Sequence, residues 1–519
     1  MPKIAKFLGR NNTQRPELCA PGFYQSDANV LITNDGTIKR RSGLTAAAFG
    51  RENPIFFESY LTLNSKTYFS NSGTNGIIVG GVTVGWGVAR PEQPTAANAG
   101  GTGDPGTYLV SLTFALTDGQ ESGASPTVAV DVTTGGISLT GLPELPADER
   151  IIGLNIYISA PNGEAGPKGT GLHRARTLIS WATGLTISDL PAAGKECATL
   201  GLAPMPAGKY CFFYRGRLYV ALGNFLVYSE PWNYEYTNLA HNFLPFEGDV
   251  TSAAPVENGI WVGTTRNAMF LAGTDPQADG GFQIKSVVNE PCLTGSVTVD
   301  QDDVSNRLLG PGRRALFVLA DGVYVGDSGG TPVNFTKHWS PDSSTPTSTG
   351  CLMSDAHGEW YVFPVDGDLY AFNLANSAVT RFLPGADAVA DLDGTTYVAN
   401  LAGVWSHAGE SDDGTPIAAL FSKSGINFNS NMIMRFTSVY FHMRSSGNLS
   451  IIVSGTTGTG TVALYDNIST MHGSRAKLPR GVQGRNLTAT VLNNDGAFFE
   501  IAEADFITEV TSRHARQTA

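Results

Sequence analysis

Charged residues are scarce in this chain, and cysteines and long apolar runs are scarcer still. Only 15% of the 519 residues are charged, against 61 glycines and 28 prolines. Long salt-bridged helices need more charge than this, whereas short strands joined by tight turns use many glycines and prolines. The hydrophobic content of 41% is enough for real cores. The composition therefore indicates an ordered all-β chain of two to four domains and excludes a disordered one.

Several kinds of segment are missing. No run approaches the roughly 18 apolar residues of a membrane helix, and the opening MPKIAKFLGRNN has no apolar core of a secretory signal. We therefore expect synthesis in a cytoplasm and no membrane span. The cysteines are odd in number and show no C-x-x-C spacing, which predicts reduced, buried thiols and neither disulfides nor zinc. They are Cys19, Cys197, Cys211, Cys292 and Cys351. No cofactor or metal is expected, since the eight histidines form no H-x-x-x-H pair.

Acidic residues outnumber basic ones, and the formal net charge is −12. A protein that grips nucleic acid through its phosphates needs a basic face. The charge balance therefore argues against tight DNA binding. It leaves open a channel through which DNA slides, because weak repulsion would prevent sticking.

Strand–turn–strand units recur along the chain. The clearest is residues 209–231, KYCFFYRGRLYVALGNFLVYSEP, where Arg-Gly and Gly-Asn turns separate strands rich in aromatic and branched side chains. Similar units occupy residues 259–272, 315–326, 358–373 and 395–405. Their spacing of roughly 40 to 60 residues is typical of β-propeller blades. A meander of this kind cannot bury both faces alone, so neighbours of the same kind are expected.

A different pattern interrupts these units. Residues 91–104 are rich in Pro, Ala, Gly and Thr and have the composition of a linker. After them, about seven short strands occupy roughly a hundred residues, as in an immunoglobulin-like or fibronectin type III-like sandwich. The propeller pattern resumes near residue 206.

These strings resemble, in order, the tail nozzle (tail tubular) proteins of short-tailed bacteriophages. The opening NVLITNDGTIKRRSGL is similar to their N-terminal hairpin, with Ser42 where they often have proline. The strings GRLYVA and VYSEP are similar to their propeller, and the segment at 108–158 is similar to their inserted sandwich. RGVQGR followed by DGAFFEI resembles their C-terminal β region.

The resemblance implies an all-β fold, in which a β-propeller is interrupted by an inserted immunoglobulin/fibronectin-like sandwich and followed by a C-terminal β domain. The expected parts are 1–90 (N-terminal hairpin and first propeller strands), 91–205 (sandwich), 206–412 (remaining blades) and 413–519 (C-terminal β region).

The same resemblance implies a non-enzymatic structural protein of the virion. Its partners would be copies of itself in a ring, commonly a hexamer, together with the head-to-tail adaptor and other tail or fibre proteins. Genomic DNA would pass through during ejection without sequence-specific contacts. Two alternatives stay open: a tail-tip protein that recognises the host surface, and a virion-associated glycan hydrolase.

Enzymatic signals are weak. Residues 326–330, GDSGG, match the string around a chymotrypsin-like nucleophile, but the upstream histidines lie in unrelated contexts, which favours a loop after a strand. Asp300, Asp302 and Asp303 could hold calcium, but they lack the glycine and distal glutamate of an EF-hand loop, so a solvated loop is favoured. No pair of carboxylates stands out as a glycosidase pair.

Two basic clusters and one aromatic cluster are candidate contact sites. The basic residues are Lys39, Arg40 and Arg41 in the first cluster, and Arg475, Lys477, Arg480 and Arg485 in the second. They could touch a partner protein or DNA phosphates, or they could form ordinary pairs between domains or subunits. For Trp232, Tyr234 and Tyr236, packing between blades is favoured over a platform for a sugar or receptor.

Overall fold

The computed structural model is built from strands, as predicted. It describes residues 3–47, 58–80, 82–133, 135–144, 146–163, 171–190, 193–299, 312–342, 350–382, 386–392, 394–400, 402–426 and 432–514. Across these residues the only helical element is a single turn of 3₁₀ helix, Pro16–Leu18, and no helix in them could cross a membrane. The chain divides into two compact units, Ser59–Pro245 on the one hand and Met1–Glu58 with Phe246–Ala519 on the other.

Six four-stranded antiparallel sheets carry the propeller pattern, and we call them blades. Two blades belong to the unit Ser59–Pro245. Their strands are β8 Glu58–Leu63, β9 Lys66–Asn71, β10 Asn75–Val79 and β11 Val82–Val84, then β20 Cys211–Tyr214, β21 Arg217–Leu222, β22 Phe225–Tyr228 and β24 Phe243–Pro245. The two blades share a core that includes Tyr68, Trp86 and Leu218.

The other four blades follow one another in the larger unit. The first two are formed by β25 Val250–Val256, β26 Gly259–Thr264, β27 Ala268–Ala272 and β28 Gln283–Val288, and by β29 Cys292–Val299, β30 Arg314–Leu319, β31 Gly322–Gly326 and β32 Pro332–Asn334. The third is formed by β33 Cys351–Asp355, β34 Gly358–Val365, β35 Asp368–Asn373 and β36 Val379–Phe382. The fourth is formed by β37 Ala388–Leu392, β38 Thr395–Asn400, β39 Gly403–His407 and β7 Leu44–Ala46. Each hydrophobic core is shared by two consecutive blades, around Trp261, Trp339 and Trp360 in turn. Successive blades pack face to face because each has two apolar faces that must be buried.

The last of these blades contains a strand from the start of the chain. β7 pairs with β39 in antiparallel register, with Trp405 opposite Ala46 and His407 opposite Leu44. The N-terminal segment therefore supplies the fourth strand of the blade formed by β37–β39.

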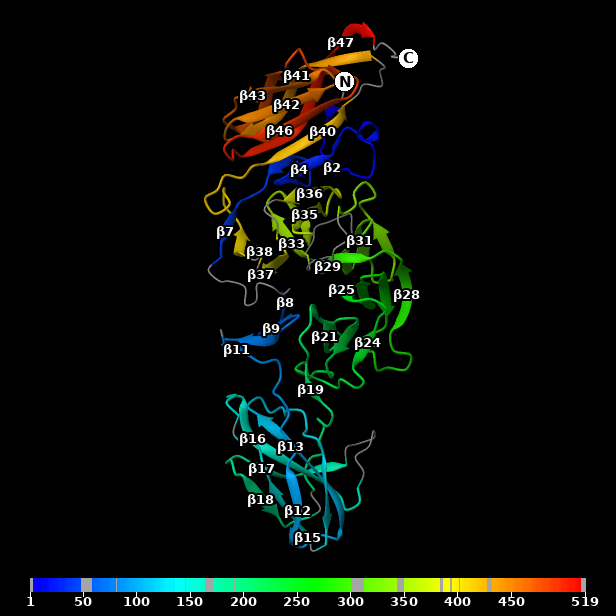
Figure 1. The fold of residues 1–519 in the computed structure, drawn as a ribbon, viewed down its shortest axis with the longest axis vertical. Coiled ribbons are helices and arrows are strands. Elements are labelled where there is room, and N and C mark those ends of the chain that lie inside the picture. The colour runs from blue at the N-terminus through cyan, green and yellow to red at the C-terminus, as the bar shows by residue number, and fades with distance from the viewer. Residues whose placement is uncertain are drawn as a thin grey trace. The chain divides into compact units, whose positions relative to one another are not determined.

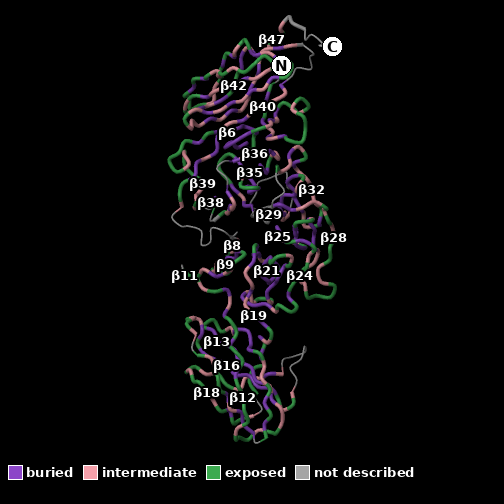
Figure 2. Tube along the Cα trace, in the orientation of Figure 1, coloured by how far each residue is buried: buried purple, intermediate pink, exposed green. Residues whose placement is uncertain are grey.

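The C-terminal β domain is a sandwich of two sheets. One has the order β44 (Ile468–Lys477), β41 (Met432–Ser445), β47 (Phe499–His514), β6 (Ile38–Arg40) and β5 (Val30–Ile32), with β1 (Lys3–Ile4) on β47 and β45 (Gln483–Gly484) on β41. The other has the order β4 (Ser26–Ala28), β40 (Leu420–Ile426), β46 (Leu487–Asn493), β42 (Leu449–Gly455) and β43 (Gly458–Leu464). Strands β42 and β46 of this second sheet alternate buried and partly exposed residues, which gives the sheet one inner face (Figure 2).

The N-terminal hairpin lies in this sandwich, and this differs from the predicted grouping with the first propeller strands. β5 and β6 extend the sheet beyond β47, with Lys39 opposite Glu500 and Ile38 opposite Ile501. β4 pairs with β40, and the short parallel pair β2 (Gly9–Arg10) and β3 (Phe23–Tyr24) lies close by (Figure 1). The physical reason is the shared core, because Val30, Ile32 and Ile38 are buried in the same cluster as Phe499 and Ile501.

The inserted domain is a seven-stranded sandwich, as the strand count predicted. Its sheets are β12 (Thr95–Gly100), β15 (Gly135–Thr140) and β18 (Gly184–Ile187), against β14 (Val128–Val132), β13 (Gly106–Leu116), β16 (Ile151–Ser159) and β17 (Leu172–Leu178). Alternate residues of β13 and β16 meet in its core, among them Val110, Leu112 and Ile156. The chain returns through β19 (Ala203–Pro204), which pairs with β23 (Tyr236–Thr237).

A buried carboxyl group lies where the N-terminal segment meets the blade β33–β36. Asp27 of β4 accepts a hydrogen bond from the Arg381 backbone N–H at 2.8 Å and faces the Tyr24 hydroxyl at 3.4 Å. Its other oxygen, Oδ1, is buried and has no hydrogen-bond partner among the described residues. Burial raises the pKa of Asp27 from 3.8 to about 7, although the backbone hydrogen bond and the charge of Arg10 act in the opposite direction.

Asp27→Asn should stabilise the protein at pH 8 much more than at pH 4. Because the pKa of Asp27 is raised in the folded state, the folded protein holds this proton more tightly, and wild-type stability falls as pH rises from about 4 to 7. The full effect is at most roughly 4 kcal/mol, at about 1.4 kcal/mol per pKa unit. The free energy of urea unfolding of both proteins across this range measures it. Asp366→Asn, in an exposed turn of the same blade, is the control; an equal gain for Asp27→Asn at both pH values would contradict the assignment.

Candidate functional site

The first basic cluster lies inside the larger unit. Lys39 binds Asp355 at 2.7 Å, and its ammonium lies 5.6 Å from the centroid of the Trp360 ring. Arg40 pairs with Glu410 and donates to the Gly496 carbonyl at 2.7 Å. All three cationic residues of the cluster are at most 5% exposed.

Arg41 makes the most complete of these pairs. Its two terminal nitrogens donate to the two carboxylate oxygens of Asp412 at 2.8 and 2.7 Å, and its Nε donates to the Asn29 side chain at 2.8 Å. Burial and pairing of Lys39, Arg40 and Arg41 favour ion pairs within the chain over a contact with DNA or another protein. Ordinary pairing between domains was one of the alternatives that the sequence left open for this cluster.

The second basic cluster is exposed. Lys477 ends β44, Arg480 lies in the turn after it and Arg485 directly follows β45. The Arg475 guanidinium lies 5.1 Å from the centroid of the Tyr440 ring. β44 is the outer strand of its sheet, and no strand in the described chain pairs with its free side. An open strand edge flanked by cations can take up another chain, so a partner contact remains the prediction for this cluster.

The predicted protease-like string forms a turn. Ser328 follows β31, and its hydroxyl donates to the Glu257 carboxylate. Asp327 accepts backbone N–H groups of Gly329 and Thr331 at 2.9 and 2.7 Å, which folds the segment into a tight loop. Within the described residues, Ser328 thus faces a carboxylate and forms no hydrogen bond with a histidine. Asp300, Asp302 and Asp303 lie outside the described residues.

A serine, a histidine and an aspartate do meet around β44, in a geometry unlike a catalytic triad. The Ser474 hydroxyl lies 2.5 Å from Asp466 Oδ2 and 2.9 Å from His472 Nε2, and that same nitrogen lies 3.2 Å from Asp466 Oδ2. His472 Nδ1 faces the Thr470 carbonyl. In a triad the carboxylate orients the imidazole through one ring nitrogen while the other takes the serine proton. Here the Ser474 hydroxyl and the Asp466 carboxylate both lie beside the same nitrogen, His472 Nε2. The three side chains therefore form a structural hydrogen-bond network.

The aromatic cluster separates into three different environments. Tyr236 is fully buried and its hydroxyl accepts the Val88 backbone N–H at 3.0 Å. Tyr234 is half-buried and packs edge-on against Phe213 at 5.8 Å. Trp232 is 74% exposed. The predicted blade packing holds for Tyr234, which packs against the core shared by two blades, and fails for Trp232. Tyr236 is buried where the segments that lead to the sandwich meet.

One loop, residues 234–237, holds both segments that connect the blades to the inserted sandwich. On the outgoing segment, Trp86 donates from its indole to the Tyr234 carbonyl at 3.1 Å. On the returning segment, the Met205 N–H donates to the Glu235 carbonyl at 3.0 Å. Gly87, with φ of +75°, lies where a Cβ would come within 2.8 Å of the same carbonyl.

The Glu235 side chain forms ion pairs with both the blade and the inserted sandwich. It is 7% exposed, and its carboxylate binds Lys66 of β9 at 2.9 Å and Arg150 of the sandwich at 3.5 Å. Arg150 in turn binds Asp148 at 2.7 Å and lies 3.3 Å from the Gly87 carbonyl. Sequence reasoning missed this network, because nothing in the string PWNYEYTN marks its glutamate as buried.

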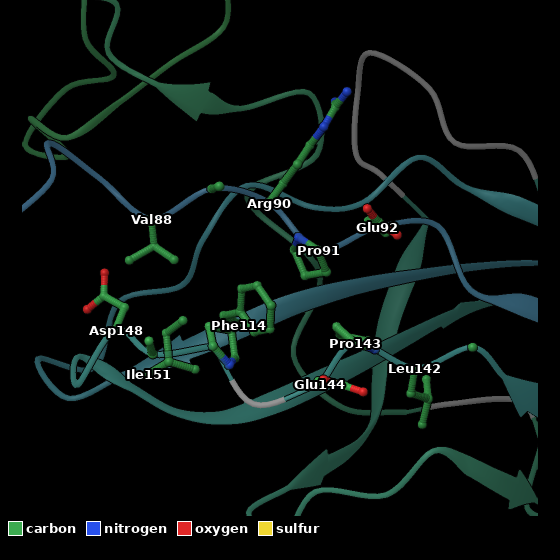
Figure 3. Close-up of a pocket in the computed structure, with 14 residues that line it drawn as sticks. Val88, Arg90, Pro91, Glu92, Phe114, Leu142, Pro143, Glu144, Asp148 and Ile151 are labelled. Atoms are coloured by element: carbon green, nitrogen blue, oxygen red, sulfur yellow. The ribbon is translucent and has the colours of Figure 1, made fainter. Parts of the chain in front are cut away.

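A pocket of about 670 Å³ opens beside this junction (Figure 3). Its apolar side chains include Val88, Phe114 and Ile151, and carboxylates of Glu92, Glu144 and Asp148 lie around them. Figure 3 shows Arg90 directed away from Phe114 and Ile151. The pocket mixes apolar walls with acidic groups.

The five cysteines are free thiols in the structure. Four are buried and Cys19 is half-exposed. Among the described residues, no group of three or more His, Cys, Asp or Glu could hold a metal ion.

Comparison with known proteins gives no family. No protein-family model and no curated protein matches the chain. Solved structures with a similar course of the chain include BBS1N in complex with ARL6DN, with 9% identity, a TM-score of 0.29 and coverage of 70% of this chain and 96% of that one. The Pan2 WD40 domain of Neurospora crassa has 10% identity, a TM-score of 0.29 and coverage of 74% and 97%. Hsv2p of Kluyveromyces lactis has 9% identity, a TM-score of 0.24 and coverage of 51% and 68%. Because these TM-scores are low, the fold is assigned from the strand order of its own sheets and not from the similarity to these structures.

Replacing Arg41 should destabilise the protein strongly. We expect Arg41→Met to lower the free energy of unfolding by about 3 kcal/mol, at the low end for a broken buried pair, because Asp412 keeps some contact with water. Arg480→Met, at an exposed position, should change it by no more than about 0.5 kcal/mol. Urea unfolding of both variants measures the difference, and equal small effects would place Arg41 at the surface.

Removing the Glu235 carboxylate should loosen the hold on the inserted sandwich. In Glu235→Ala, Lys66 and Arg150 lose their shared partner, so we expect faster amide hydrogen exchange in peptides covering residues 86–90 and 203–205. Glu247→Ala, at a carboxylate that is 83% exposed, serves as the control. Unchanged exchange in both connecting segments would show that Glu235 does not hold them.

Proposed function

We propose that this protein is a structural component of a bacteriophage tail, a nozzle subunit that forms a ring with copies of itself around the path of the genome. The observation that carries the proposal is the order of the parts. The hairpin, first blade, inserted sandwich, further blades and C-terminal sandwich succeed one another in the chain as the resemblance to tail nozzle proteins implies.

The distribution of charge supports the proposal in two ways. The net charge of −12 suits a channel wall that DNA passes without sticking. The exposed cations Arg475, Lys477, Arg480 and Arg485 beside the open edge of β44 suit contact with a neighbouring subunit or the adaptor. A ring closes through heterologous contacts, in which one surface of each subunit meets a different surface of the next.

Negative-stain electron microscopy of the purified protein tests the proposal. We expect rings with a central hole. Lys477→Glu combined with Arg480→Glu should reduce the fraction of rings, because the substitutions reverse charge at the proposed contact. Arg176→Glu combined with Lys285→Glu, at exposed positions elsewhere, should leave the rings intact.

A protein that stays monomeric at every concentration and in the presence of the adaptor would contradict the nozzle role. If such a monomer bound host cells, it would favour the alternative of a receptor-recognising tail-tip protein. Release of reducing sugar from a host glycan would favour the hydrolase.

A further inference from the structure

Trp232 combines two costly features. Its φ is +61°, in the left-handed region, and its side chain is 74% exposed. The other described non-glycine residues with positive φ are Asn, Ser, Asp and Arg, most of which adopt this conformation more readily. The left-handed conformation costs free energy for a residue with a bulky side chain. Burial in the core does not offset this cost here, because the side chain is mostly exposed.

The position of Trp232 is nevertheless well fixed. Its backbone N–H donates to the Gly216 carbonyl at 2.9 Å. Arg215 and Gly216, with φ of +47° and +81°, form the tight turn between β20 and β21. A Cβ on Gly216 would lie 3.3 Å from the indole ring, so the absence of a side chain there lets the ring lie on the turn. The turn thus supports one part of the indole while most of the ring stays in solvent.

The surroundings of the ring fit a small polar ligand better than a protein. The other exposed large hydrophobic residues of β21 and β22, Leu222 and Phe225, lie at the opposite end of these strands, and the aromatic neighbour of Trp232 is the half-buried Tyr234, with ring centroids 6.5 Å apart. Its chain neighbours include Asn233 and the half-buried Glu230, whose carboxylate accepts a hydrogen bond from Asn242 at 2.7 Å. An exposed flat ring beside a second, half-buried aromatic ring and among hydrogen-bonding groups matches a sugar, which has an apolar C–H face and a rim of hydroxyls.

We propose that Trp232 is the stacking platform of a saccharide-binding site on the blade β20–β24. The indole would cover one face of a sugar ring, and the neighbouring polar side chains would meet its hydroxyls. This site does not depend on the nozzle role, since loss of sugar binding and loss of rings are separate measurements.

Binding of defined oligosaccharides tests the site directly. The full chain is titrated calorimetrically with cellotetraose, maltotetraose and chitotetraose, and we expect at least one of them to bind. Trp232→Ala should weaken that binding about tenfold or more, as truncation of a contact tryptophan does, while Trp232→Phe should weaken it less. Tyr465→Ala, at another aromatic residue that is 80% exposed, should leave it unchanged. No binding of any probe to the wild-type protein, or equal binding to Trp232→Ala, would overturn the proposal.

The thermal stability of a glycine variant provides a second test. Glycine adopts a φ near +61° without strain, so Trp232→Gly should leave the melting temperature unchanged or raise it, while it abolishes binding. A clear fall in melting temperature would show that Trp232 is retained for the fold, and this too would overturn the proposal.

Discussion

The buried cations of the N-terminal hairpin are the constraint on which the larger unit depends. Lys39, Arg40 and Arg41 are adjacent, and burying a charge without a partner costs several kcal/mol. Each therefore requires a carboxylate partner, supplied by Asp355 in one case and by Glu410 and Asp412 in the others. Asp355 belongs to the blade β33–β36, and the other two follow the blade that β7 completes. One short segment thus specifies the pairing of blades and C-terminal sandwich at the same time.

In the other unit, a buried charged residue likewise connects two parts of the chain, the blades and the inserted sandwich. The sandwich is joined by two connecting segments, and one loop holds both of them through backbone hydrogen bonds and the buried Glu235 carboxylate. A blade loop that serves as the attachment point of an insertion cannot move freely. Trp232 lies only two residues before this loop begins, and its backbone is held by the turn between β20 and β21.

Much of the fold could be predicted from the sequence because its signals are local. Turn dipeptides and aromatic strands located the blades, and the change at residues 91–104 located the sandwich. The position of the N-terminal hairpin could not be predicted in this way. Its partners, β40 and β47, lie more than 350 residues away, and pairing over such a distance leaves no periodic signal. Arg41 and Glu235 show the same limit, because a charged residue in a sequence does not reveal whether a distant partner will bury it. Trp232 was expected to pack between blades, but its exposure, its positive φ and the turn beneath it distinguish it from Tyr234 and Tyr236.

Hydrogen exchange of the full chain with Arg41→Met tests most directly whether the N-terminal segment joins blade and sandwich. If it does, the variant exchanges faster than the wild type in β7 and β39 and also in β4 and β40, while residues 59–245 are unaffected. An increase confined to residues 38–42 would contradict this account, because it would mean that the blade and the sandwich hold together without the segment that pairs with both.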